Sequence, residues 1–276
     1  MTTPVTKLRG PSRVRSRTPR PSTVIPPSKG DRPRIRVVQA ERAIRLFDAD
    51  PELFHGVEEE MIERVRGVAV AEVVDVKRGS CTLQQSRKPH FGVLLLDGVL
   101  ARRAQVAGAS CCELVGPGDV VRPWLDCGES SPLPTQTAWQ ALVRSSVAVL
   151  DDRFAYAVRL WPQVPAALMD RLLLRGRWLE FQLAVCQRKT VEERLHLMLW
   201  QFAYRWGTVT PEGVALRLPL THHLLAEIVG AERPTVTTAL GCLREAGLIQ
   251  QVRGRERGWL LAGKPPGEVQ HVAGRL

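Results

Sequence analysis

Apolar and polar positions alternate most regularly between residues 220 and 248. The first half of this stretch predicts a short helix that Thr221 caps, because a side-chain hydroxyl satisfies a free N–H group of the first turn. Gly230 interrupts the pattern, as a sharp turn with positive φ requires. The second half predicts a helix over residues 233–246, with Pro234 in its first turn, where the missing N–H costs little. The apolar positions of the first helix are Leu224, Leu225 and Ile228.

The second predicted helix has two different faces, because side chains repeat at about 3.6 residues per turn. The inward face consists of Val236, Ala239, Leu240 and Leu243, and the outward face of Arg233, Pro234, Thr237, Thr238 and Gly241. The outward face is short, polar and partly cationic, which is what the major groove of DNA accepts. Pairs of amphipathic helices also form parts of protein cores without any ligand. The residues that follow therefore decide between the two interpretations.

A predicted β-hairpin follows the helix pair. Residues 248–252 change from apolar to polar and residues 259–261 are apolar again, which is typical of two short strands. The tip between them is rich in glycine and arginine, and its arginines are Arg253, Arg255 and Arg257. Arginines at such a tip would contact phosphate oxygens beside the helix and add affinity without sequence choice. The hairpin therefore favours DNA binding.

Residues 191–262 resemble the winged-helix output domain of the Crp/Fnr family of bacterial transcription regulators. The matching positions are Leu220, Thr221, Gly230, Arg233, Thr235, Val236, Leu240, Leu243, Gly247, Leu248 and Ile249. One position departs slightly, since the small residue of the first helix, Ala226, lies one place earlier than in the family pattern. The resemblance implies a DNA-binding regulator.

The resemblance also assigns roles to single residues of the second helix. It implies that Arg233 makes a bidentate contact to guanine. The next family position often carries a Glu that contacts cytosine, and Pro234 cannot replace it. An Arg common in the family is replaced by Thr238, so Thr237 and Thr238 would touch thymine methyl groups, and the preferred operator should differ. The expected phosphate contacts at helix N-termini are Thr221 and Thr235.

The middle of the chain predicts a β-rich domain. Residues 51–65 predict one short amphipathic helix, and the valine-rich residues 67–76 predict a strand. Asp97-Gly98 predicts a hairpin with a type I′ turn, and the GPGD run at residues 116–119 predicts a second turn. Residues 138–150 predict further strands. This order is typical of a jelly-roll-like barrel and resembles the family's cyclic-nucleotide-binding-like domain.

The expected ligand pocket departs from that of cyclic-AMP-binding members. Those members have a Gly-Glu-Leu run after the Gly-Asp turn and, later, an Arg that pairs with the cyclic phosphate. Residues 120–125 and 135–138 contain neither feature, and a phosphate without a cationic partner is poorly held. We therefore expect no cofactor and no cyclic AMP binding of the usual kind. A different effector, of unknown identity, could contact Arg122, Trp124 and Trp139; alternatively both tryptophans belong to the barrel core and Arg122 to the surface.

A long helix is predicted from residue 164 to about residue 188. Its apolar positions repeat every three or four residues: Met169, Leu172, Gly176, Leu179, Leu183 and Cys186. The resemblance implies that this helix, through Met169, Leu172, Gly176, Leu179 and Leu183, forms a parallel homodimer. Such a dimer would place two DNA-reading helices about one turn of DNA apart and bind an inverted repeat. Packing of the same stripe on its own barrel is the alternative, and both uses can coexist.

Most of the net positive charge of the chain lies in its N-terminal residues. Residues 1–36 contain ten Lys and Arg and one acid, so they hold about +9 of the net charge of +11. We expect this tail to be disordered and to be either an auxiliary DNA-binding arm or a solvated extension. No secretory signal or membrane span is expected.

The six cysteines lack disulfide, cluster or metal-ligand spacing, and Cys111, Cys112 and Cys127 are expected to be ordinary thiols rather than an oxidant sensor or metal site. His222 and His223 are adjacent and cannot share one metal ion.

The fold expected from these observations is α+β, with the resemblance covering residues 40–262. The predicted segments are a basic tail (1–36), a barrel sensor domain (37–162), a linker and dimerisation helix (163–189), a winged helix-turn-helix (190–263) and a C-terminal tail (264–276). The leading hypothesis is a cytoplasmic, nucleoid-associated regulator whose partners are double-stranded DNA, a second copy and RNA polymerase. The alternative is a ligand-binding sensor with secondary or non-specific DNA binding. An enzyme is not expected, because no catalytic constellation is recognisable.

Overall fold

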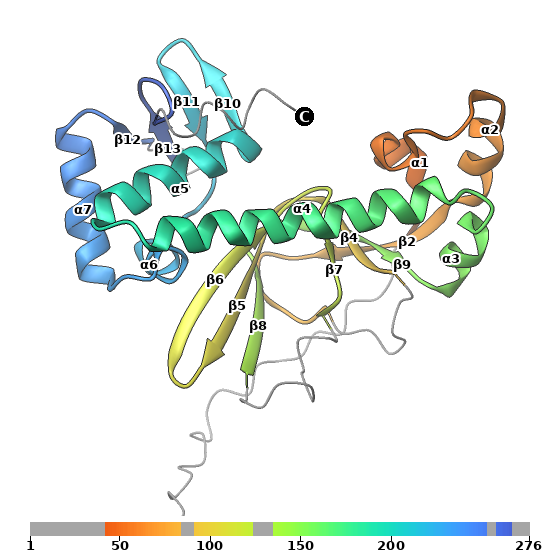
Figure 1. Ribbon diagram of the computed structural model, residues 1–276, viewed down its shortest axis with the longest axis horizontal. Helices are drawn as coiled ribbons and strands as arrows, with labels where there is room; N and C mark the ends of the chain where they lie inside the picture. Colours follow the sequence, from red (N-terminus) through yellow and green to blue (C-terminus); the bar gives the residue numbers. More distant parts are fainter. Residues whose placement is uncertain (1–41, 84–90, 124–134, 253–257, 267–276) are drawn as a thin grey trace, which may run out of the picture. The chain divides into compact units, whose positions relative to one another are not determined.

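The computed structural model describes residues 42–83, 91–123, 135–252 and 258–266, and Figure 1 shows their arrangement. The predicted α+β class is confirmed: two antiparallel sheets form the N-terminal half, and helices with a third sheet form the C-terminal half. The N-terminal elements are β1 (Arg42–Arg45), α1 (Leu46–Ala49), η1 (Pro51–Phe54), α2 (Glu59–Val68), β2 (Val70–Val76), β3 (Gly79–Cys81), β4 (Gly92–Asp97), β5 (Leu100–Val106), β6 (Ala109–Val115), β7 (Val120–Val121), β8 (Thr135–Ala141), β9 (Ser145–Leu150) and α3 (Asp152–Val158).

The jelly-roll-like domain predicted from the strand pattern consists of two separate sheets. One has the order β1-β2-β9-β4-β7 and the other the order β3-β8-β5-β6, and all described strand pairs in them are antiparallel. Side chains from both sheets meet in one buried cluster that includes Val93, Leu100 and Val147. The two sheets therefore form a jelly-roll-like domain around a shared core, without closure among the described residues.

The hairpin predicted at Asp97-Gly98 is wrong. Strand β4 before it pairs with β7 and β9, whereas β5 after it pairs with β6 and β8, so the chain crosses from one sheet to the other. Gly98 has a φ of 87°, and a Cβ atom there would lie 2.2 Å from the Oγ atom of Ser145. The glycine is needed for close approach at this crossing. A two-residue hairpin instead joins β5 to β6 at Ala107-Gly108, where both φ angles are positive (50° and 86°), as a type I′ turn requires.

The single helix predicted over residues 51–65 is also wrong. The chain forms η1, breaks at residues 55–58, and begins α2 at Glu59. Gly56 has a φ of 84°, which a continuing right-handed helix cannot contain. The break lets Leu53 and Phe54 of η1 and Val65 of α2 enter the same buried cluster. The pattern of apolar and polar residues over 51–65 could not by itself distinguish one helix from two.

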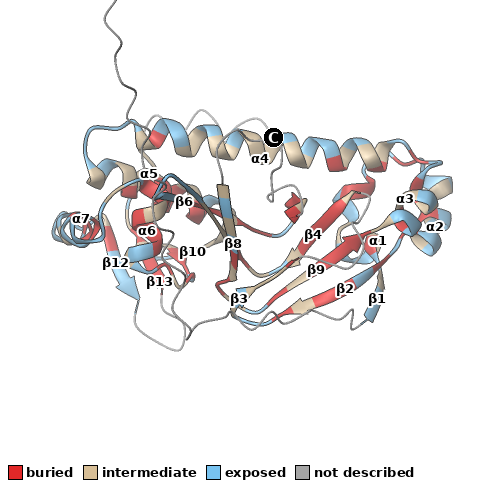
Figure 2. Cartoon of the chain, turned by 90° about the horizontal axis from the view of Figure 1, so that it is seen from below, coloured by how far each residue is buried: buried red, intermediate tan, exposed pale blue. Residues whose placement is uncertain are grey.

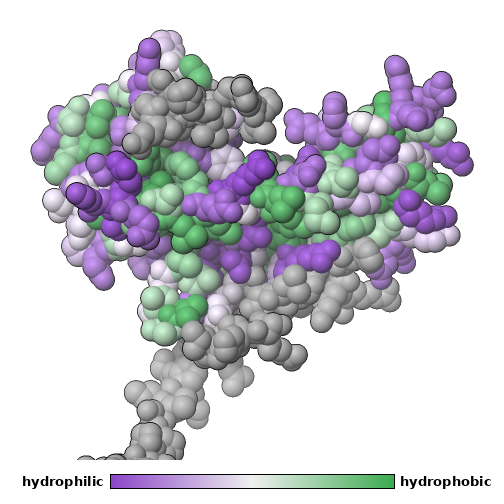
Figure 3. Space-filling view, in the orientation of Figure 1, coloured by the Kyte–Doolittle hydropathy of each residue, from purple (hydrophilic) through white to green (hydrophobic). Residues whose placement is uncertain are grey.

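Helix α4 (Gln163–Cys186) agrees with the long helix predicted from residue 164 onward. Three of its residues, Val164, Leu168 and Val185, are buried, and most of its length is coloured intermediate or exposed in Figure 2. Apolar side chains appear at the surface along its course in Figure 3. The helix thus carries apolar surface that the described part of the chain leaves exposed.

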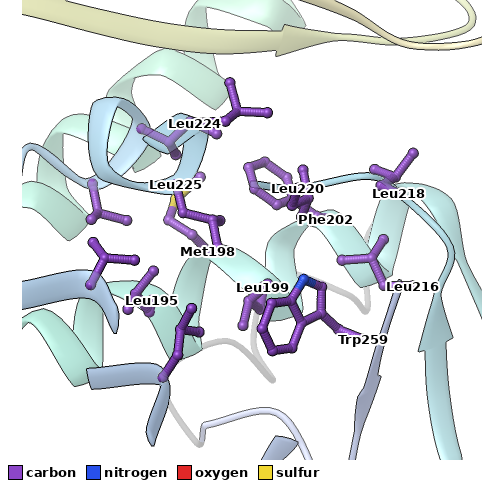
Figure 4. Packing of buried hydrophobic residues seen from close by; sticks show 14 of the residues in the cluster. Leu195, Met198, Leu199, Phe202, Leu216, Leu218, Leu220, Leu224, Leu225 and Trp259 are labelled. Carbon is purple, nitrogen blue, oxygen red and sulfur yellow. The ribbon is translucent and has the colours of Figure 1, made fainter. Parts of the chain in front are cut away.

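The C-terminal half contains α5 (Val191–Trp206), β10 (Gly207–Thr210), β11 (Gly213–Leu216), α6 (His222–Val229), α7 (Arg233–Glu245), β12 (Ile249–Val252) and β13 (Gly258–Leu261). Thr190 caps α5, since its hydroxyl accepts from the Glu193 N–H. The strands form one sheet in the order β10-β11-β13-β12, of which the hairpin β10–β11 has no counterpart in the sequence predictions. Leucines of α5 and α6 pack with Trp259 of β13 in one cluster (Figure 4). That cluster holds α6 and α7 in place.

Candidate nucleic-acid interface

Helix α6 begins and ends where the sequence predicts. The hydroxyl of Thr221 accepts a hydrogen bond from the Leu224 N–H at 3.1 Å, which is N-cap geometry. Gly230 has a φ of 62° and ψ of 50°, and this left-handed residue ends the helix. The turn then passes directly into α7. Thr221 therefore fixes the start of α6, and Gly230 fixes the point at which the chain turns toward α7.

The cap leads to a stability prediction. Replacing Thr221 by alanine should lower the free energy of unfolding by about 1 kcal/mol, because an N–H of the first turn loses its acceptor. Thr221→Ser keeps the hydroxyl and is the matched control. Urea unfolding monitored by circular dichroism measures both. Equal midpoints for the alanine and serine variants would contradict a capping role.

Helix α7 presents the two faces that the sequence predicts. Val236, Ala239, Leu240 and Leu243 are buried, whereas Arg233, Pro234, Thr235, Thr237 and Thr238 are exposed and Gly241 is intermediate. Pro234 lies in the first turn. The outward face is thus accessible and consists of one guanidinium group, short hydroxyl side chains and little bulk. A surface of this shape can approach base edges closely.

The threonine hydroxyls of α7 are bonded to the helix backbone. Thr237 Oγ1 donates to the carbonyl of Arg233 at 3.1 Å, and Thr238 Oγ1 donates to the carbonyl of Pro234 at 3.3 Å. A hydroxyl that donates its hydrogen in this way keeps its lone pairs as acceptors. The two side chains therefore suit apolar contact through the methyl group and acceptance of a hydrogen bond.

One residue of this surface was not among the predicted site residues. His222, the first residue of α6, places its Nδ1 atom 2.9 Å from Thr237 Oγ1 on α7. Burial lowers the pKa of His222 below its ordinary value, and the guanidinium groups of Arg233 and Arg244 lower it further. Sequence spacing gave a reason to reject His222 as a metal ligand, but no signal that it meets Thr237.

The β-hairpin predicted after the helix pair, here called the wing, is formed by strands β12 and β13. The residues of its tip, 253–257, lie outside the described residues. β12 and β13 pair from Ile249↔Leu261 to Val252↔Gly258. Trp259 is buried and anchors the wing in the cluster of Figure 4. Arg253, Arg255 and Arg257, predicted to contact phosphate, lie outside the described residues.

Polar contacts join helices α5 and α6 of the C-terminal half to strands β5 and β6, to helix α4 and to the GPGD turn. Arg103 of β5 pairs with the mostly buried Glu227 of α6 at 2.7 Å. The amide of Gln182 on α4 donates both to the Cys112 carbonyl of β6 (2.8 Å) and to the Ile228 carbonyl of α6 (2.9 Å). Arg205 of α5 pairs with Asp119 at 2.8 Å. The GPGD turn predicted from the sequence is therefore tied to the first helix of the C-terminal half.

Two of the three residues proposed for an effector pocket, Arg122 and Trp139, lie among the described residues. Arg122 donates from Nε to the Phe91 carbonyl at 2.9 Å. Trp139 is 9% exposed and packs in the core between the two sheets, as the core alternative predicts. Trp124 lies outside the described residues. The structure thus gives Arg122 and Trp139 partners within the fold.

The cysteines differ in exposure and in chemistry. Burial raises the pKa of Cys112 to about 12 and that of Cys81 to about 11, which keeps both thiols protonated and unreactive near neutral pH. Cys111 is exposed, and Cys127 lies outside the described residues. Within the described part of the chain, no group of three His, Cys, Asp or Glu residues has the geometry to hold a metal ion.

Comparisons with known proteins agree with this geometry. The model of the Crp-like helix-turn-helix domain matches residues 193–261. The CRP-like cAMP-activated global transcriptional regulator of Mycobacterium tuberculosis is 30% identical over 209 residues, which cover 72% of this chain and 88% of that protein. The chain belongs to the Crp/Fnr family. It contains a Crp-like helix-turn-helix domain, and the mycobacterial relative is a transcriptional regulator.

Two further proteins are similar to this member of the Crp/Fnr family. The regulatory protein CysR of Synechococcus elongatus is 31% identical over 142 residues, half of this chain, and the chain spans only 60% of the length of CysR. The solved structure of FixK2 from Bradyrhizobium japonicum has the same fold, with a TM-score of 0.53 and 20% identity over 70% of this chain and 93% of FixK2. None of the described helices is both long and apolar enough to cross a membrane.

Proposed function

We propose that this Crp/Fnr regulator binds an inverted repeat in double-stranded DNA as a homodimer, with α7 in the major groove. The exposed outward face of α7 is the observation that carries the proposal, because an exposed polar face on a helix held by a buried apolar face fits base readout. Arg233 supplies a bidentate contact to guanine. Thr237 and Thr238 contact thymine methyl groups, and Thr221 and Thr235 contact phosphates.

The homodimer is proposed from the exposed apolar stripe of α4. Met169, Leu173 and Leu183 are 60%, 62% and 66% exposed, and a Cβ atom at Gly176 would meet nothing within 4 Å. These four positions recur every three, four or seven residues, so they share one side of the helix. Apolar surface of this length is costly to leave in water and is covered when two copies of α4 pair in parallel.

Two residues of the predicted dimer stripe also have contacts within the chain. Leu172 packs against the buried cluster that contains Leu53 and Leu168. Leu179 lines a small cavity together with Met198 and Phe202 of α5. Both lie toward the edge of the stripe, which agrees with a helix that packs on its own domain on one side and on a second copy on the other. Leu173, absent from the sequence prediction, is added to the proposed interface.

A charge in the stripe should separate the two copies. Leu173→Glu is expected to shift the protein from dimer to monomer at micromolar concentration, because two like charges would be buried against each other. Arg177→Glu, on an exposed position of the same helix, is the matched control and should remain a dimer. Analytical ultracentrifugation measures both. A wild-type monomer, or an unchanged mass for Leu173→Glu, would contradict the proposed interface.

The proposed sensor role lies in the N-terminal half. Asp119, the last residue of the GPGD turn, pairs with Arg205 of α5, so a change at this turn would reach the DNA-binding half directly. An effector is proposed to act there, of a class other than the cyclic AMP recognised by the Gly-Glu and Arg motif, since that motif is missing. RNA polymerase is the proposed partner for transcription control once the operator is bound.

Fluorescence anisotropy with labelled duplexes at several salt concentrations tests DNA binding. We expect tight binding to one sequence and weak binding to others, with log K falling linearly against log salt concentration in both cases. Similar affinity for every duplex would indicate non-specific binding and favour a ligand-binding sensor with secondary DNA binding.

A further inference from the structure

The two helices of the helix-turn-helix are joined at the DNA-facing surface by a contact that the proposed base readout does not use. The Nδ1 atom of His222 lies 2.9 Å from Thr237 Oγ1, and that hydroxyl is also 3.1 Å from the Arg233 carbonyl. His222 is only partly buried and Thr237 is exposed. The imidazole therefore adjoins the residue proposed to contact a thymine methyl group and the residue proposed to contact guanine.

Hydrogen counting links the protonation of His222 to the state of Thr237. Thr237 has one hydroxyl hydrogen, and it can point either to the Arg233 carbonyl or to His222 Nδ1. When Nδ1 carries no hydrogen, His222 and the carbonyl compete for that hydrogen. When His222 is charged, Nδ1 donates to Thr237 Oγ1, the hydroxyl hydrogen is directed to the carbonyl, and Nε2–H is available as a cationic donor. The neutral ring with its hydrogen on Nδ1 satisfies the same contacts, but only the charged ring also presents Nε2–H as a donor to a phosphate.

The charges around His222 make its protonation depend on DNA. Arg233 and Arg244, both on α7, are the charged groups that act on the ring, and with burial they lower the pKa of His222 in the free protein. On α6 itself, His223 lies 3.8 Å from Glu227, and Arg103 of β5 also pairs with Glu227. Phosphate groups of bound DNA would add negative charge beside the ring and favour its charged form.

We propose that His222 is a positioning residue for Thr237 that takes up a proton when DNA binds, so that operator affinity increases as the pH falls. This inference rests on the proposed DNA-binding function and deepens it, because it names a pH dependence of that same surface. His222 acts through the orientation of the Thr237 hydroxyl and through an Nε2–H donor directed to a DNA phosphate.

The direction of the pH effect follows from proton linkage. The pKa of His222 is lowered in the free protein and is raised toward or above its ordinary value in the complex. Affinity therefore rises as the pH falls through the bound-state pKa and levels off below the free-state pKa, with a maximum slope of about tenfold per pH unit for one proton. Above both pKa values, the ring is neutral in both states and contributes no pH dependence.

Anisotropy titrations from about pH 5.5 to pH 8 at fixed ionic strength, the range in which histidine titrates, test the inference on the full-length protein. The variants are His222→Gln and the matched control His223→Gln, which removes the neighbouring histidine. We expect the wild type and His223→Gln to bind more tightly at low pH, and His222→Gln to lose most of that slope. Calorimetry in buffers of different ionisation enthalpy should show proton uptake by the wild type that is absent in His222→Gln.

A third variant tests the connection to Thr237. Thr237→Val removes the hydroxyl and keeps the shape, and combining it with His222→Gln should weaken binding by less than the product of the two separate effects. All replaced side chains lie at the surface, so thermal unfolding should change little. An unchanged pH slope in His222→Gln, or a wild type that binds specifically without any pH slope, overturns the inference alone. A wild type that binds no operator at any pH overturns the proposed function and the inference with it.

Discussion

Replacing Arg233 by alanine is expected to reduce affinity for the preferred operator by roughly 5- to 150-fold, which corresponds to about 1–3 kcal/mol. The side chain is exposed in the first turn of α7, and its guanidinium group can donate two parallel hydrogen bonds to the edge of a guanine. The loss should be concentrated at one base position in each half-site. Anisotropy with the operator and with single-base variants of it measures this change.

Two control variants separate readout from simple charge. Arg233→Lys keeps the charge and removes the bidentate geometry, so it should lose base discrimination while retaining much of the non-specific affinity. Arg244→Ala removes a cation from the last turn of the same helix and should leave the base preference unchanged. A uniform loss of affinity across all sequences for Arg233→Ala would show that Arg233 contacts phosphate only.

Replacing Asp119 by alanine is expected to lower the free energy of unfolding by about 3–5 kcal/mol. The carboxylate is 8% exposed, pairs with the 15% exposed Arg205 at 2.8 Å, and also accepts from the Gly116 N–H. Without it, the guanidinium group stays largely buried without its counter-charge, stacked near the rings of Trp178 and Trp206. Chemical denaturation monitored by tryptophan fluorescence measures the loss.

A double substitution distinguishes an unpaired charge from lost packing. Asp119→Leu with Arg205→Met removes both charges and should recover most of the stability, because a buried ion pair can be replaced by apolar groups at little net cost. Asp97→Ala, at an exposed carboxylate, is the surface control and should change stability by less than about 0.5 kcal/mol. Equal stability of Asp119→Ala and the wild type would show that the ion pair does not hold the GPGD turn to α5.

The helix-turn-helix could be predicted almost to the residue. Its signals are local: Thr221 caps a first turn, Gly230 takes a left-handed conformation, and Val236 and Leu240 recur at helical spacing. Each of these depends on neighbours within a few residues, which the sequence places directly. The assignment of α7 as a two-faced helix followed from the same short-range information.

Sheet topology could not be predicted in the same way. Asp97-Gly98 has a favourable hairpin composition, yet Gly98 lies at a crossing between sheets, where the close approach of Ser145, distant in the sequence, requires a glycine. The true hairpin uses Ala107-Gly108, in which alanine accepts a positive φ without any compositional signal. Strand pairing depends on contacts between residues far apart in the chain, so periodicity alone does not determine it.

In the candidate site too, local features could be predicted from the sequence and contacts between distant residues could not. Arg233, Thr237 and Thr238 were predicted from one helical face, because the face follows from spacing. His222 was missed as a site residue because its partner, Thr237, lies on the next helix and the turn angle brings them together. Trp139 had two interpretations in the sequence, and only its burial between the two sheets places it in the core.

Selection of DNA from a random pool by the full-length protein tests the central claim most directly. A homodimer with α7 in the major groove should enrich an inverted repeat whose half-sites are centred about 10 base pairs apart, or a multiple of that spacing. The conserved guanine of each half-site should disappear from the motif when Arg233→Ala is selected in parallel. Enrichment of DNA without a shared motif, or of a motif that Arg233→Ala leaves intact, would contradict sequence-specific readout by α7.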